Sequence, residues 1–292
     1  MFKSGFVAIL GRPNVGKSSI MNAFVGEKVA IVSNRPQTTR NKILGVANRS
    51  GVQIVFVDTP GLHKPRTRLG EYMVKTANDA REGVDAVLAV VDGQHIGEGD
   101  LAILNDLSQM RCPKYLAVNK IDIVTPEVLM PQLAKLHDIS FDQIVSVSAK
   151  RGDNMDILFS LLANAMPEGP KYFPDDMITD QPERVLCAEI IREKALLNLR
   201  EEIPHGVGVE MMRIEQLSDH LTEIHADLYC EKASHKAIII GKNGAMLRTI
   251  GEQSRMDIER LLGTRVMLKI WVRVREDWRN RASDLRTLGY EE

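Results

Sequence analysis

The segment GRPNVGKS, residues 11–18, is the first group of residues whose types and spacing suggest chemistry. Its glycines would let backbone N–H groups curl around phosphate oxygens, and a helix starting there would add partial positive charge. Lys17 could then contact the β- and γ-phosphates, and the Ser18 hydroxyl could bind Mg²⁺. The pattern indicates a bound nucleoside triphosphate without specifying the base. The predicted phosphate-loop contacts are Gly11, Arg12, Pro13, Asn14, Val15, Gly16, Lys17, Ser18 and Ser19.

A second motif, DTPG, follows an apolar strand-like run. By itself an aspartate before Pro-Gly is an ordinary turn, but its position 41 residues after Lys17 favours a functional interpretation. Asp58 would hold Mg²⁺ through a water molecule, and the Gly61 N–H would donate to the γ-phosphate and sense its loss. The predicted contacts in this motif are Asp58, Thr59, Pro60 and Gly61.

The motif NKID, residues 119–122, predicts the base. The Asp122 carboxylate can accept hydrogen bonds from N1–H and the 2-amino group of guanine, whereas adenine would leave this charge unpaired. Asn119 can tie this loop to the phosphate loop, and the Lys120 stem can lie against the base. SAK follows the next strand and adds Ser148, Ala149 and Lys150, where the Ala149 N–H can reach guanine O6. A kinase or ATPase with a phosphate loop needs neither motif, so we favour guanine nucleotides.

Alternating strands and helices must position these motifs. The predicted strands are Phe6–Leu10, Gln53–Val57, Ala86–Val91, Tyr115–Val118 and Ile144–Val147. The predicted helices are Ser18–Val25, Leu69–Arg81, Asp100–Gln109, Glu127–His137 and Met155–Ala165. Nearly continuous apolar strands that alternate with helices indicate an α/β P-loop fold, with a mostly parallel sheet and helices on both faces. Residues 5–165 resemble GTPases of the translation-factor class, and we assign residues 1–166 to a GTP-binding domain.

That resemblance implies further roles. In the polar segment Val32–Arg40 a threonine should close over Mg²⁺ and the γ-phosphate, and of Thr38 and Thr39 we favour Thr39. The predicted catalytic residues are Lys17, Thr39 and Gly61, and the predicted metal ligands are Ser18, Thr39 and Asp58. Leu62 stands where signalling GTPases carry a glutamine that orients water, so we expect slow hydrolysis. The resemblance also suggests that Asn14 helps to bind K⁺.

The second half has a different organisation. Residues 167–182 are rich in proline and lack periodicity, so we predict a linker before a domain at 183–292. The sequence predicts a helix over Glu183–Arg200, strands over Val207–Gln216 and Leu221–Tyr229, a helix over Ala245–Leu262, a strand over Arg265–Val274 and a last helix over Glu276–Arg286. Propensity favours a strand over Ala237–Ile240.

Residues 241–244, GKNG, match the GXXG loop of KH domains, which clamp nucleic-acid backbones. Residues 232–290 contain 13 basic and 6 acidic side chains in a chain of net charge −1, which favours a polyanionic partner for this region. KH resemblance makes Ala237–Ile240 the last turn of a short helix, and the preceding elements are those of the smaller α+β type II KH domain. The predicted RNA contacts are Ile239, Ile240, Gly241, Lys242, Asn243, Gly244, Lys269 and Arg273.

Composition excludes other classes. No run approaches the roughly 18 apolar residues of a membrane-spanning helix. The three cysteines are far apart and the histidines form no ligand pattern, so neither a disulfide framework nor a zinc site is indicated. We expect a cytoplasmic protein.

The combination of TTR at residues 38–40, DTPGL at 58–62 and a C-terminal type II KH domain resembles the Era family of bacterial GTPases. The resemblance implies binding of 16S ribosomal RNA near its 3′ end, a role in small-subunit assembly, peripheral contact with the inner membrane, and a monomer. The alternative is a GTPase switch whose C-terminal domain docks protein partners instead of RNA.

Overall fold

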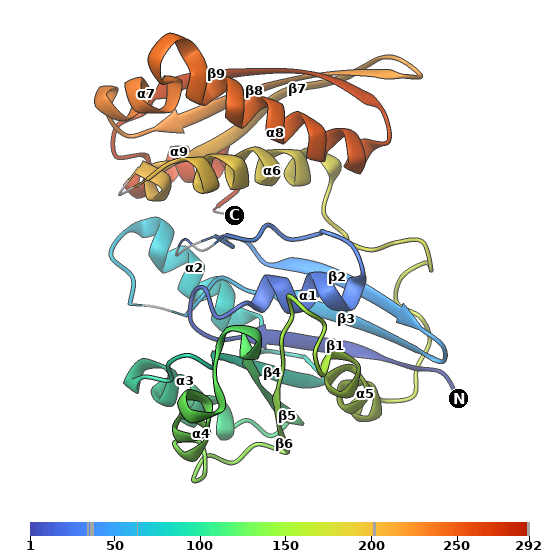
Figure 1. Ribbon diagram of the computed structural model, residues 1–292. Coiled ribbons are helices and arrows are strands. Elements are labelled where there is room, and N and C mark those ends of the chain that lie inside the picture. Colours follow the sequence, from blue (N-terminus) through green and yellow to red (C-terminus); the bar gives the residue numbers. More distant parts are fainter. Residues whose placement is uncertain (34, 36–37, 63, 201–202, 291–292) are drawn as a thin grey trace. The chain divides into compact units, whose positions relative to one another are not determined.

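The computed structural model describes residues 1–33, 35, 38–62, 64–200 and 203–290 (Figure 1). The chain divides into two compact units. The first consists of Met1–Val32, Thr39–Lys64 and Met73–Asp180. The second consists of Gln181–Glu292 together with two short segments from the first half of the chain, Ser33–Thr38 and Pro65–Tyr72.

A six-stranded sheet in the order β2-β3-β1-β4-β5-β6 forms the centre of the first unit. Only β2 is antiparallel to its neighbour. The strands are β1 (Lys3–Leu10), β2 (Ile43–Arg49), β3 (Val52–Asp58), β4 (Ala86–Asp92), β5 (Lys114–Asn119) and β6 (Gln143–Ser146). The predicted α/β fold with a mostly parallel sheet is confirmed. Because the parallel strands end at one edge, the loops that follow them come together there.

Helices cover both faces of this sheet, which explains why its strands are apolar at nearly every position (Figure 1). On one face, Val7 and Ile9 of β1 share a core with α1 (Lys17–Val25) and α5 (Met155–Ala165). On the other face, Ala8 and Leu10 pack with α3 (Glu98–Ser108) and α4 (Pro126–Ala134). Helix α2 (Arg68–Asp79) follows the DTPG motif, and a short helix η1 (Ile121–Ile123) follows β5.

The proline-rich segment predicted as a linker is bound to the first unit through residue 180. Buried Gln53 of β3 accepts hydrogen bonds from the N–H groups of Tyr172 and Phe173 at 2.7 and 3.0 Å, and it donates to the Phe173 carbonyl at 2.8 Å. The Ile178 carbonyl accepts from the Val46 N–H at 2.8 Å. The segment is therefore a strap along β2 and β3 that adds to the GTP-binding unit.

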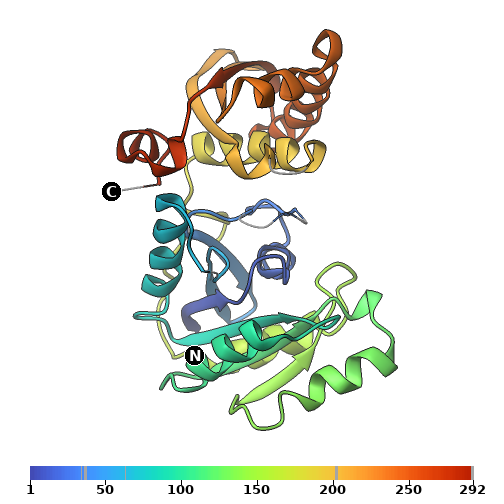
Figure 2. The same ribbon diagram turned by 90° about the vertical axis from the view of Figure 1, so that its left-hand side faces the viewer.

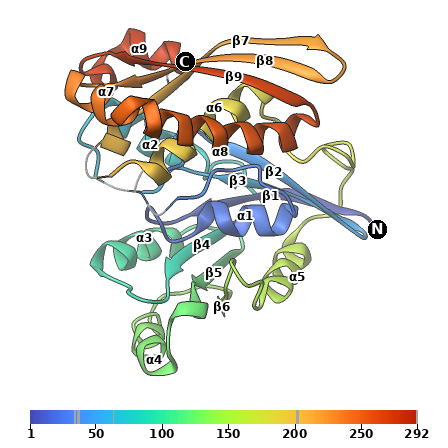
Figure 3. The same cartoon turned by 45° about the horizontal axis from the view of Figure 1, so that its top comes forward.

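A three-stranded sheet, β7-β8-β9, forms the centre of the second unit. β7 (Gly208–Ser218) is antiparallel to β8 (Leu221–Cys230), and β9 (Arg265–Val274) is parallel to β8. Helices α6 (Glu183–Asn198) and α8 (Ala245–Leu262) lie side by side against one face of the sheet, as Figures 1 and 3 show. The short elements are η2 (Ile203–Gly206), α7 (Ala233–Ile240) and η3 (Lys242–Gly244). The prediction that Ala237–Ile240 ends a short helix is confirmed, and the strand that propensity favoured there is wrong.

The predicted single helix over Glu276–Arg286 is wrong. The segment forms a short helix η4 (Trp278–Asn280) and then α9 (Ala282–Thr287), because Arg281 between them has an extended backbone. Figure 2 shows this red C-terminal segment to one side of α6 and α8. The Trp278 side chain is fully buried and donates to the Gly206 carbonyl at 2.9 Å, which anchors the segment to the unit. No helix in the described part of the chain is long and apolar enough to span a membrane.

Candidate functional site

The phosphate loop joins β1 to α1, as its motif predicted. Gly16 has φ +101°, a conformation that favours glycine, and a Cβ atom added there would lie 2.1 Å from the Asn119 Nδ2 atom. The buried Lys17 Nζ donates to the carbonyl oxygens of Gly11 and Arg12 at 3.1 and 3.0 Å. Burial lowers the pKa of Lys17 to about 8, and the charge of Asp58 opposes this shift. The loop is thus a curled backbone with an ammonium group held at its centre.

Three oxygen-bearing side chains converge beside this loop. The Ser18 hydroxyl donates to the Asp58 Oδ2 atom at 2.6 Å, and the Thr39 hydroxyl donates to the same atom at 3.3 Å. The two hydroxyl oxygens lie 3.0 Å apart. Of the two candidate threonines, Thr39 is therefore the one beside Ser18, whereas the Thr38 hydroxyl donates to the Arg35 carbonyl at 2.6 Å.

Asp58 is completely buried at the end of β3. Burial raises the pKa of this carboxyl, while Lys17, the two hydroxyls and the Thr59 N–H oppose the shift. The Asp58 Oδ1 atom is buried and has no hydrogen-bond partner among the described residues. A carboxylate with one unused oxygen beside two hydroxyls is a donor set that suits a hard cation such as Mg²⁺.

The predicted base-recognition residues come from two neighbouring loops that the structure brings together. Asn119 Nδ2 donates to the Val15 carbonyl at 2.9 Å, and Asn119 Oδ1 accepts from the Ala149 N–H at 3.1 Å. The Ser148 hydroxyl donates to Asp122 Oδ1 at 2.8 Å, which orients this carboxylate and leaves it able to accept from a base. Lys150 is exposed on the same loop.

The loop after DTP approaches the phosphate loop closely. The Leu62 N–H donates to the Gly11 carbonyl at 3.1 Å, and a Cβ atom added at Gly61 would lie 2.5 Å from the Pro13 nitrogen. Glycine is therefore the only residue type that fits at position 61 without a shift of the Pro13 backbone. Leu62 is buried, as Pro60 and Thr59 are, and the Thr59 hydroxyl donates to the Ile9 carbonyl at 2.9 Å. Ser19 lies within α1. Positions 34, 36–37 and 63 of the two switch segments lie outside the described residues.

Two ion pairs near this site were not predicted. Arg12 of the phosphate loop pairs with buried Asp100 of α3 at 3.1 Å. Lys120 pairs with Asp92, at the end of β4, at 2.7 Å. Asp92 ends β4 and Asp100 lies in the helix after it, so only the parallel arrangement of strands, and no local motif, could have pointed to them.

The GKNG loop connects α7 to α8 in the second unit. Gly241 and Gly244 have φ +73° and +76°, and a Cβ atom at Gly241 would lie 2.8 Å from the Met246 Cβ atom. Asn243 also has positive φ, at 53°. Lys242 and Asn243 are exposed at the loop tip, and the positive end of α8 begins directly after Gly244. Ile239 is buried in the core below the loop and Ile240 is half-buried.

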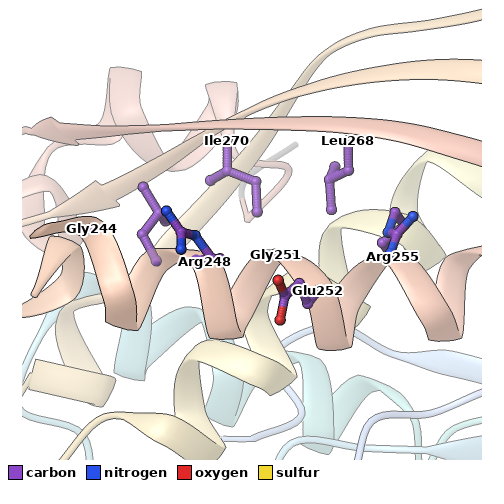
Figure 4. A pocket seen from close by; sticks show the side chains of 8 residues that line it. Gly244, Arg248, Gly251, Glu252, Arg255, Leu268 and Ile270 are labelled. Carbon is purple, nitrogen blue, oxygen red and sulfur yellow. The ribbon is translucent and has the colours of Figure 1, made fainter.

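A groove of about 450 Å³ extends from this loop between α8 and β9, which is an edge strand (Figure 4). Its lining residues are Gly244, Leu247, Arg248, Gly251, Glu252 and Arg255 of α8, with Leu268 and Ile270 of β9. Apolar side chains on one side and arginines on the other suit unpaired nucleotides, whose bases need an apolar surface and whose phosphates need positive charge. The two arginines were not predicted as RNA contacts, although Arg248 and Arg255 recur on one helical face after the GXXG loop.

The structure does not bring Lys269 and Arg273 together with the GKNG loop. Side chains alternate along β9, so Leu268 and Ile270 line the groove while Lys269 faces the opposite side of the sheet. There Lys269 pairs with Glu223 at 2.7 Å, and Arg273 pairs with buried Asp227. RNA contacts by these two residues stay a prediction.

Comparisons with known proteins agree with both units. Residues 6–120 match the family model described as 50S ribosome-binding GTPase, and residues 202–279 match the KH domain model. The chain is 52% identical to GTPase Era of Alkaliphilus metalliredigens over 99% of both chains. It is also 52% identical to GTPase Era of Clostridioides difficile over the full length of both.

Two solved structures cover 100% of both chains with 38% identity and a TM-score of 0.94. One is Era in complex with MgGDPNP and nucleotides 1506–1542 of 16S ribosomal RNA, and the other is an Aquifex aeolicus Era variant bound to GDP and AlF4⁻. Both units of this chain therefore have counterparts in these solved structures. The chain belongs to the Era family of GTPases, enzymes that hydrolyse GTP.

Proposed function

We propose that this GTPase couples its nucleotide state to the binding of single-stranded RNA in the groove between α8 and β9. We further propose that the RNA is 16S ribosomal RNA near its 3′ end and that the setting is assembly of the small ribosomal subunit. The observation that carries the proposal is the groove itself, which joins a GXXG loop to an apolar wall and a row of arginines. A relative of the same domain order was solved with nucleotides 1506–1542 of that RNA.

In this proposal Mg²⁺ is held by Ser18, Thr39 and Asp58. The Asp58 Oδ1 atom supports this assignment. A buried carboxylate oxygen needs a partner, and the described part of the chain supplies none for this atom. The ion would neutralise charge on the β- and γ-phosphates. Lys17 and the loop amides bind the same phosphates, and the Gly61 N–H donates to the γ-phosphate.

Hydrolysis is slow in this proposal, because the buried Leu62 side chain cannot orient a water molecule. Backbone groups near Gly61, or a group from a partner, position the attacking water instead. Asn14 binds K⁺ beside the phosphates. Equal turnover in NaCl and KCl would remove K⁺ from the proposal without affecting GTP binding.

Nucleotide state reaches the RNA unit through the segment before Thr39. Ser33–Thr38 is part of the second unit, where the fully buried Arg192 of α6 donates to the Thr38 carbonyl. Arg35 of the same segment donates to the Leu199 carbonyl at 3.2 Å. Because Thr38 is adjacent to Thr39 in the chain, binding or release of Mg²⁺ by Thr39 would act on the contact between Thr38 and Arg192. By thermodynamic reciprocity, RNA that favours the GTP form must also tighten GTP binding.

We place the protein in the cytoplasm as a monomer with peripheral contact to the inner membrane, as the family resemblance implies. These properties are independent of the RNA groove. Fractionation of cells and sedimentation of the purified chain would test them.

The main experiment measures RNA affinity of a double variant, Lys242→Asp with Asn243→Asp, at fixed salt. We expect at least roughly tenfold weaker binding of a 16S 3′-end fragment, because two phosphate-facing positions become acidic. GTP affinity should not change. The matched control is Lys75→Asp with Asn78→Asp, an equal charge change on exposed positions of α2.

The same fragment should bind more tightly with a GTP analogue than with GDP. Unaltered RNA binding by the loop variant would favour the docking of a protein partner in the C-terminal domain. Equal affinity in both nucleotide states would contradict the coupling and leave RNA binding itself intact.

A further inference from the structure

Gly251 lies in the middle of α8, where its position is not explained by packing. Glycine is less favourable than alanine in a helix interior. A Cβ atom added at Gly251 would meet no atom within 4 Å, and the backbone there does not have positive φ. Neither crowding nor conformation therefore requires glycine. What the missing side chain provides is open space above the helix, and Gly251 lines the groove at that point (Figure 4).

A carboxylate stands next to this space. Glu252 lies between Arg248 and Arg255 along the groove-facing side of α8, as Figure 4 shows. Spacings of four and three residues allow ion pairs with both arginines. Yet within the described chain the side chains of Glu252 and Arg248 form no hydrogen bond or ion pair, and the Arg255 side chain reaches only Glu259, at 4.0 Å. The fold does not use the Glu252 charge.

A carboxylate in an RNA groove can accept hydrogen bonds from a base but repels phosphates. The Watson–Crick edge of guanine presents two adjacent donors, N1–H and the 2-amino group, which match the two oxygens of a carboxylate. Adenine and cytosine present one amino donor beside an acceptor, and uracil presents one N–H between two acceptors. The same match explains guanine recognition by Asp122 in the nucleotide site.

We propose that Glu252 selects guanine at one position of the bound RNA. A guanine base lies on the bare helix backbone at Gly251, with Leu268 and Ile270 on the far wall, and its Watson–Crick edge donates to the Glu252 carboxylate. Arg248 and Arg255 contact the neighbouring phosphates. This inference rests on the proposed RNA binding by the groove and adds its base preference.

The test uses labelled uridine-rich hexamers that carry guanosine, inosine or adenosine at one central position. We expect the protein to bind the guanosine hexamer roughly tenfold more tightly than the adenosine hexamer, since a bidentate contact gives that discrimination. The inosine hexamer, which lacks the 2-amino group, should be intermediate. In Glu252→Gln the ratio of guanosine to adenosine affinity should fall to about one or reverse, because an amide can pair with N1 and N6 of adenine.

A merely repulsive role for Glu252 gives a different result. Removing a negative charge would then tighten all three hexamers by the same factor, and this outcome would overturn the proposal. The control is Glu276→Gln, an equal charge change at an exposed residue outside the groove, which should keep the ratio.

A second pair of variants tests the space at Gly251 separately from the charge. Gly251→Ala and Gly251→Leu should both fold, since the added atoms enter open space, and their unfolding temperatures should equal or exceed that of the unmodified protein. Gly251→Leu should nevertheless bind the guanosine hexamer at least tenfold more weakly than Gly251→Ala does. Equal binding by the two variants would contradict the placement of the base on Gly251.

If no hexamer and no 16S fragment binds the unmodified protein, RNA binding by the groove is itself wrong. If they bind without base preference, only the role of Glu252 is wrong.

Discussion

The side-chain nitrogen of Asn119 lies 2.9 Å from the carbonyl oxygen of Val15. The same carboxamide accepts a hydrogen bond from the Ala149 N–H at 3.1 Å, so one buried side chain joins the phosphate loop to both base-recognition loops. These loops follow different strands, and without this link each could move separately. Asn119 therefore holds the triphosphate and the guanine sites at a fixed separation.

Asn119→Ala should weaken GTP binding by about 1–3 kcal/mol, because two buried groups lose their partner. Titration calorimetry with GTP and GDP would measure this loss, which we expect to be similar for both nucleotides. Asn164→Ala, at an exposed position of α5, is the control and should bind GTP normally. An Asn119→Ala variant of unchanged affinity would show that the loops hold their positions without it.

Asp122→Asn should change which base the protein accepts. The Ser148 hydroxyl holds this side chain at 2.8 Å, so an amide of the same shape would keep the position. An amide accepts only one of the two guanine donors, and its NH2 group faces the other, so GTP affinity should fall by more than roughly tenfold. Xanthosine triphosphate, with a carbonyl at C2, should gain affinity in the variant. Competition binding with the two nucleotides would measure the exchange, and an unchanged preference for GTP would contradict the assignment of Asp122.

Most of the nucleotide site could be predicted from sequence because each motif is local and follows a strand. Gly16 and Gly61 are two such motif residues. Asn119 approaches Gly16 and Pro13 approaches Gly61 so closely that each position requires glycine. The antiparallel β2 was not predicted, because ILGVANR is short and lies directly after the polar switch segment. A local pattern could not reveal Asp92 and Asp100, whose partners are 28 and 88 residues away.

In the C-terminal unit, the sequence predicted the strand but not the partners of its basic side chains. The basic strand RVMLKIWVRV was located correctly, and its residues Lys269 and Arg273 were predicted to contact RNA. Alternation along β9 points Lys269 away from the groove and toward a carboxylate on β8. Charge in a sequence does not reveal which basic side chains are already paired, and only the register of Lys269 opposite His225 and beside Glu223 shows it.

The strap at residues 167–180 leads to a prediction about stability. Gln53→Ala should lower the free energy of unfolding by about 2–4 kcal/mol, because the N–H groups of Tyr172 and Phe173 lose a buried acceptor. Urea unfolding would measure the change. Gln143→Ala, at an exposed position of β6, is the matched control and should change stability by less than about 0.5 kcal/mol. A linker that makes no stabilising contact with β3 would leave the two variants equally stable.

The outer face of the KH sheet should become less stable in acid. Lys269 and then His225 lower the pKa of Glu223 to about 2, from an ordinary value of 4.5. Because the folded pKa is lower than the unfolded one, this carboxylate stabilises the fold fully above pH 4.5, and the stabilisation is lost as the pH falls toward 2. The difference in urea midpoint between the unmodified protein and Glu223→Gln should therefore be largest above pH 4.5 and shrink steadily below it. Glu276→Gln, which replaces an exposed carboxylate, should show no such trend. A difference that stays constant from pH 5 to pH 2 would mean that Lys269 and His225 do not stabilise the Glu223 charge.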